Sequence, residues 1–138
     1  MDHKRLRTLL VVHGLITAAA GLVLAVDPGL IPSAVGIRLA LGAYLVVYLL
    51  AGAEFGFAVL SFGGARLADA QALRLIAWTC IAFHGASGVL ETYAYLQGAS
   101  PAILANVVAR AVIVGLFFVL SRGPSGRSAT KSTFPHHG

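Results

Sequence analysis

The chain has 138 residues, of which 58% are hydrophobic and 11% are charged, and its formal net charge is +5. Soluble domains carry about 25% charged residues, so this composition, with a mean hydropathy of +0.86, excludes an ordinary water-facing domain and indicates a bilayer protein. The basic residues lie between apolar segments instead of forming one basic face, which argues against a nucleic-acid interface.

Four apolar segments reach the length of about 20 residues that a membrane-spanning helix needs. Breaker sequences rich in Gly, Pro and polar residues separate them. The predicted helices cover residues 8–26, 37–62, 72–96 and 101–121. Together they form one transmembrane domain, residues 1–121. The polar, Gly/Ser/Pro-rich segment 122–138 is predicted to be a disordered cytoplasmic tail.

The distribution of Lys and Arg predicts the orientation. With both termini in the cytoplasm, eight basic residues lie inside and only Arg38 lies outside. Short loops make neighbouring helices antiparallel. We therefore predict an all-α integral membrane four-helix bundle, up-down, with both termini cytoplasmic, in the cell (inner) membrane. In a competing interpretation, a signal peptide is cleaved after Val23-Leu24-Ala25, which would leave three helices.

Ionisable residues within the predicted helices are the candidates for function. Each costs at least about 2.5–3.5 kcal/mol at mid-bilayer, so it should face the bundle interior. Counting 1.5 Å per residue from the helix ends places Glu54, His84 and Arg110 in one central layer. Glu54 is predicted to pair with Arg110, with Asn106 on the same face and His84 bonding to either. Such a layer fixes helix register, forms a proton or substrate pathway, or belongs to a ligand site.

A second ionisable group lies toward the outer end of the third predicted helix. Glu91 is seven residues from His84, about 10 Å along a helix axis, so the two are not expected to pair directly. Arg38 lies near the same predicted membrane interface. We therefore predict an outer pair between Arg38 and Glu91.

A short internal similarity suggests a role for histidine. A His-Gly dipeptide begins at His13 and again at His84, and each is followed by a proline-containing break and an arginine, Arg38 or Arg110. The chain can thus be read as two helical hairpins related by an axis along the membrane normal. His13 and His84 would then lie on facing helices, where two neutral histidines can ligate a haem b iron. A quinone or lipid pocket lined by the same groups is an equal alternative.

Close helix packing in lipid depends on small residues and polar contacts. Gly52 and Gly56 form a GxxxG motif in the second predicted helix and are predicted to be a packing face. The expected partners are the lipid bilayer and either further copies of the chain or a larger membrane complex.

The layout resembles the small four-helix bacterial membrane proteins of the DoxX-like type and related uncharacterised families. The resemblance lies in "GLVLAVDPGLIPSAVGI", in "RLALGAYLVVYLLAGAEFGFAVLSF" and in the mid-helix His84, and it extends to about Leu120. It implies a four-helix membrane fold, and for some members a place in respiratory or redox assemblies. It transfers no catalytic residue.

The leading functional prediction is a non-enzymatic accessory subunit or homo-oligomer with a central polar layer. The first alternative is a haem- or quinone-binding redox protein that uses His13 and His84. The second is a proton-linked small transporter that uses Glu54, His84 and Arg110. The sequence contains no Walker-type loop, serine elbow, HExxH motif or metal cluster, so it favours no enzyme class.

Overall fold

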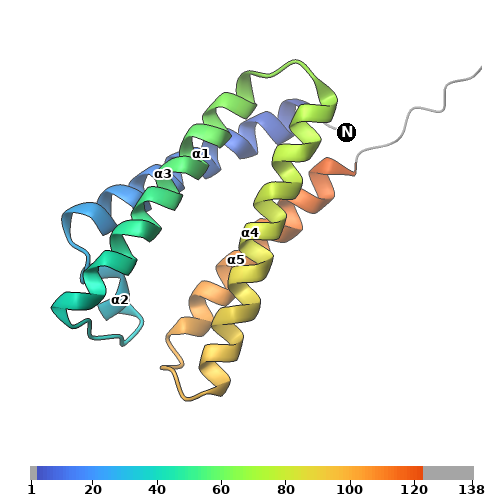
Figure 1. Ribbon diagram of the computed structural model, residues 1–138. Coiled ribbons are helices and arrows are strands. Elements are labelled where there is room, and N and C mark those ends of the chain that lie inside the picture. The colour runs from blue at the N-terminus through green and yellow to red at the C-terminus, as the bar shows by residue number, and fades with distance from the viewer. Residues whose placement is uncertain (1–2, 123–138) are drawn as a thin grey trace, which may run out of the picture.

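The computed structural model describes residues 3–122, and this part of the chain contains helices and no strands (Figure 1). Its elements are α1 (His3–Val26), α2 (Leu30–Ala34), the 3-10 turn η1 (Leu41–Ala43), α3 (Tyr44–Arg66), α4 (Ala70–Leu96) and α5 (Ile103–Ser121). Four helical segments are long and apolar enough to cross a membrane, which agrees with the sequence prediction. The predicted disordered tail lies outside the described residues except for Arg122.

The second spanning helix starts later and ends later than the predicted range 37–62. Gly36 has a positive φ of 79°, and Ala40 is extended, so the helix begins only after the η1 turn. At the other end, Gly63 and Gly64 remain helical, and the chain leaves the helix after Arg66. The short helix α2 in the connection before it was not predicted.

The helices are arranged as two pairs, in which α1 lies along α3 and α4 lies along α5 (Figure 1). The pairs meet at the end where residues 67–69 connect α3 to α4. Here Asp69 caps α4 by accepting hydrogen bonds from the backbone of Gln71 and Ala72, and Arg7 of α1 donates to the Leu67 carbonyl at 2.6 Å. An apolar cluster fills this region, made of Leu6, Leu10, Leu73, Ile76, Ala77, Cys80 and Phe117. We call it the closed end.

At the opposite end, which carries α2 and the connection 97–102, the two pairs diverge (Figure 1). We call this the open end. Its buried apolar cluster is smaller and consists of Leu24, Val47 and Ala51, all within the α1/α3 pair. The two pairs are therefore held together mainly at the closed end and by the side chains between the two ends.

The predicted GxxxG motif does not pack within the chain. A Cβ atom added at Gly52 or Gly56 would meet no other group within 4 Å. Glycines of α1 are used instead, since a Cβ at Gly14 would lie 2.9 Å from the Phe62 ring and one at Gly21 would lie 3.2 Å from the Ala51 carbonyl oxygen. These two glycines allow α1 and α3 to approach closely.

Candidate functional site

Two histidines meet between the helix pairs. His13 of α1 and His84 of α4 are both buried, and their Nε2 atoms lie 2.8 Å apart, at hydrogen-bond distance. The Nδ1 atom of His13 lies 2.8 Å from the hydroxyl oxygen of Ser61 on α3. The histidine pair thus connects the α1/α3 pair to the α4/α5 pair through directed polar contacts.

Arg110 of α5 extends this arrangement toward the open end. Its Nη1 donates to the Nδ1 of His84 at 3.2 Å, and its Nε donates to Oε1 of Glu91 at 2.8 Å. The side-chain amide of Asn106 donates to the same Glu91 oxygen at 2.7 Å. All four spanning helices contribute to the resulting network. We call it the polar chain, which runs in the order Ser61, His13, His84, Arg110, Glu91 and Asn106.

The polar chain pairs the predicted residues differently from the sequence prediction. Arg110 forms its ion pair with Glu91 and not with Glu54. Residues at similar distances from a short connection face each other in a helix pair, and Glu91 and Arg110 flank the connection 97–102 in this way. Glu91 and His84 are linked only indirectly, because the guanidinium of Arg110 bonds to both of them.

The predicted outer pair between Arg38 and Glu91 is not made. Arg38 lies in the non-helical stretch between α2 and η1, where it is exposed. Glu91 Oε1 receives its hydrogen bonds from Arg110 and Asn106 instead. The positional count failed because it assumed that Arg38 belongs to a spanning helix.

Aromatic rings surround the two histidines. The Phe117 ring lies 5.4 Å from that of His13, the Phe83 ring lies 5.2 Å from that of His84, and both contacts are edge-to-face. Phe57 packs on Phe83, with ring centroids 4.1 Å apart. Sequence reasoning missed these rings and Ser61. Ser61 follows Glu54 by seven residues and therefore shares its helix face, a signal that was available.

The contact between the histidines bears on the haem prediction. Axial ligands lie on opposite sides of the iron, so their nitrogens are separated by two bonds of about 2.0 Å each, if metal–imidazole bonds in proteins are taken as a guide. His13 and His84 are 2.8 Å apart, which leaves no space for a porphyrin between them in this arrangement. Among residues 3–122, no three His, Cys, Asp or Glu side chains gather as a metal site.

Glu54 of α3 lies beside the polar chain without joining it. Its side chain is 9% exposed, and within residues 3–122 it has no hydrogen bond or ion pair. It faces a cavity of about 680 Å³ that lies between the two helix pairs at the open end. We call this the inter-pair cavity. Its walls are largely apolar, and its polar lining consists of Glu54, Glu91, Asn106 and Arg110.

A smaller pocket of about 180 Å³ continues from Glu54 toward the histidines and is also lined by His13 and His84. A space of this size and polarity can hold water molecules. Beyond the histidines, the apolar cluster of the closed end begins with Phe117. The cavities therefore reach the middle of the helices from the open end and stop there.

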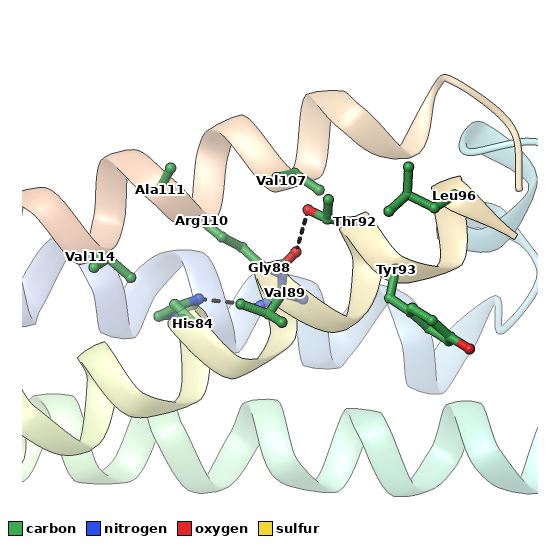
Figure 2. A pocket seen from close by; sticks show the side chains of 11 residues that line it. His84, Gly88, Val89, Thr92, Tyr93, Leu96, Val107, Arg110, Ala111 and Val114 are labelled. Atoms are coloured by element: carbon green, nitrogen blue, oxygen red, sulfur yellow. Dashed lines mark hydrogen bonds between the residues drawn. The ribbon is translucent and has the colours of Figure 1, made fainter.

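The polar chain can also be reached from a groove between α4 and α5 (Figure 2). The groove has a volume of about 570 Å³, and its walls carry small and apolar residues such as Gly88, Val89 and Val107. His84 and Arg110 supply the charged and imidazole groups in its lining. Arg110 thus lines both this groove and the inter-pair cavity.

Comparison with known proteins adds no assignment. No family model matches the chain, and no match was found among curated proteins or solved structures. The resemblance to DoxX-like proteins therefore stays a prediction.

Proposed function

We propose that the protein is a small multi-pass protein of the cell membrane that acts without catalysis, by holding a small amphiphilic molecule between its two helix pairs. The observation that carries this proposal is the inter-pair cavity. Its volume of about 680 Å³ falls within the range of about 300–1,000 Å³ that is typical of small-molecule sites. Apolar walls with a few converging polar groups are also typical of such sites.

The predicted topology indicates the side of the membrane from which a ligand would enter. Four helices of sufficient length and apolarity support a membrane location, and the Lys and Arg distribution favours cytoplasmic termini. In that orientation the open end lies on the outer side of the membrane. A ligand would enter from that side, or from the outer half of the bilayer.

A substitution that fills the cavity tests this function. Ala105 of α5 lines the inter-pair cavity, and its replacement by Trp should occupy much of the space. We expect an organic extract of the purified wild-type protein to contain a small molecule at about one per chain by mass spectrometry. The Ala105→Trp variant should contain at least about tenfold less.

Val108 supplies the matched control. It lies on the same helix, is 62% exposed, and is absent from the lining of the cavities described above. The Val108→Trp variant should retain the molecule at the wild-type level. Equal amounts in all three proteins, or none in the wild type, would contradict the proposal.

The predicted accessory-subunit or homo-oligomer role is the second candidate. The observation that favours it is the exposed position of Gly52 and Gly56, which leaves a GxxxG face free on α3. If copies of the chain pack through this face, Gly56→Leu should convert the oligomer to a monomer, as measured by light scattering in detergent. An unchanged mass, or a monomeric wild type, would argue against it.

A further inference from the structure

We propose that the inter-pair cavity selects a lipophilic cation, and that Glu54 exchanges a proton for this cation. The inference rests on the proposed function and specifies the charge of the ligand. It follows from the charges that face the cavity, from the absence of a partner for one of them, and from the chemistry of the walls.

The charge of Arg110 is already matched. Its Nε lies 2.8 Å from a carboxylate oxygen of Glu91, and its Nη1 is bonded to His84. Glu54 has no such partner in the described part of the chain, although only 9% of its side chain is exposed. An isolated carboxylate is costly in a low-dielectric interior, and it is made tolerable by a proton or by a positive charge.

The other ionisable groups around Glu54 form no ion pair with it, although Arg110 attracts its carboxylate at longer range. They are His13 on α1, His84 and Glu91 on α4, and Arg110 on α5. The two ring nitrogens of each histidine are occupied in the polar chain. With Glu54 ionised, Glu54, Glu91 and Arg110 carry one net negative charge.

A carboxylate oxygen of Glu91 would also be stabilised by a positive charge or a hydrogen-bond donor. The Oε2 atom of Glu91 is buried and has no hydrogen-bond partner among residues 3–122. Glu91 lines the inter-pair cavity together with Glu54. Within the described part of the chain, Glu54 and the Oε2 atom of Glu91 are thus acceptors without a donor, and carboxylate oxygens of this kind attract a cation or a hydrogen-bond donor and repel an anion.

The walls of the cavity determine what kind of cation fits. They include Leu24 of α1, Ile31 of α2 and Leu50 of α3, with Ile103 of α5 opposite. Such walls suit an apolar body and offer nothing to a hydrated metal ion. The ligand class is therefore an organic cation that carries aromatic or alkyl groups.

The exchange at Glu54 involves one proton and no other bond. With the cavity empty, Glu54 is a carboxylic acid. When a cation enters, the acid O–H bond breaks, the proton leaves to solvent through the open end, and the carboxylate pairs with the cation. Binding should thus become tighter as pH rises, because fewer protons compete.

Tetraphenylphosphonium is a suitable probe because it is a lipophilic cation with no titratable proton of its own. Its binding to the full-length protein in detergent can be measured by titration calorimetry in two buffers of different ionisation enthalpy. We expect saturable binding with release of up to one proton per cation. Tetraphenylborate, which has the same shape and the opposite charge, should not bind.

Glu54→Gln should raise the Kd for tetraphenylphosphonium by at least about 20-fold and abolish proton release, because the variant offers no charge and no acidic proton. Glu54→Asp keeps the carboxylate and should retain binding within about fivefold. Asp27→Asn is the matched control, since it removes an exposed carboxylate outside the cavity lining. It should leave the Kd unchanged, and circular dichroism verifies the fold of each variant.

The outcomes separate this inference from the proposed function. Equal binding of the cation and the borate, or a folded Glu54→Gln variant with wild-type affinity, overturns the inference. In either case a molecule that is extracted from the wild type and lost in Ala105→Trp still supports the proposed function. Absence of cation binding in the wild type also overturns the inference, whatever the extraction shows.

Discussion

The two ends of the molecule are built on different principles. At the closed end, seven buried residues from α1, α4 and α5 pack together. Six of them are 0% exposed, and Ile76 is 8% exposed. At the open end, the pairs separate around a cavity of about 680 Å³. The polar chain lies between them, where apolar packing stops. The apolar cluster therefore holds the two helix pairs together, whereas the divergent end leaves space for a ligand.

Replacing a leucine by alanine at each end should give the largest difference in the free energy of unfolding. Leu10 is fully buried in the closed end, and Leu10→Ala should lower the free energy of unfolding by about 3 kcal/mol. Leu50 is 40% exposed and lines the inter-pair cavity, so Leu50→Ala should cost less than about 1 kcal/mol. Unfolding by SDS in mixed micelles, followed by circular dichroism, measures both. Similar losses at the two positions would refute the distinction.

The ion pair between the two ends should give the next largest effect. Arg110→Met leaves Glu91 without its cation and should destabilise the protein by about 2–3 kcal/mol. This is below the value for a fully buried pair because both side chains are slightly exposed, at 15% and 18%. The double variant Arg110→Met/Glu91→Met should recover most of the loss in the same assay, since no lone charge remains. A double variant as unstable as the single one would contradict this account.

The glycine positions should give the smallest effect. Gly14→Val should destabilise by about 1–2 kcal/mol, because its Cβ would come within 2.9 Å of the Phe62 ring and force it to move. Gly56→Val introduces the same residue where nothing lies within 4 Å. Its effect in thermal unfolding of the monomer should stay within about 0.5 kcal/mol. Equal effects would mean that helix propensity, and not packing, governs both positions.

The spanning helices could be predicted from the sequence because bilayer thickness sets a length that apolar residues must cover. Their boundaries were harder to predict. Residues 37–43 are as apolar as the helix that follows, so hydropathy does not reveal that Gly36 turns the chain and Ala40 is extended. The two pairs agree with the division suggested by the two His-Gly dipeptides, although Arg38 and Arg110 occupy different environments.

It was easier to predict which residues belong to the polar chain than to predict how they pair. His13, His84, Asn106 and Arg110 were all identified, because polar groups in an apolar helix must face inward. Their partners depend on how the pairs diverge and on which residues face each other across a short connection. Counting depth from the helix ends contains neither kind of information, and it therefore assigned Arg110 to Glu54 instead of Glu91.

Arg110 has a consequence for hydrogen positions far from its own helix. A guanidinium only donates, so the Nδ1 of His84 accepts, and a neutral His84 carries its hydrogen on Nε2. That hydrogen is then donated to Nε2 of His13, which leaves the His13 hydrogen on Nδ1, directed at Ser61. The two rings are thus opposite tautomers, and all three bonds point the same way. Any ligand that draws Arg110 away from His84 therefore removes the constraint on both tautomers, and its effect extends to the Ser61 hydrogen bond on α3.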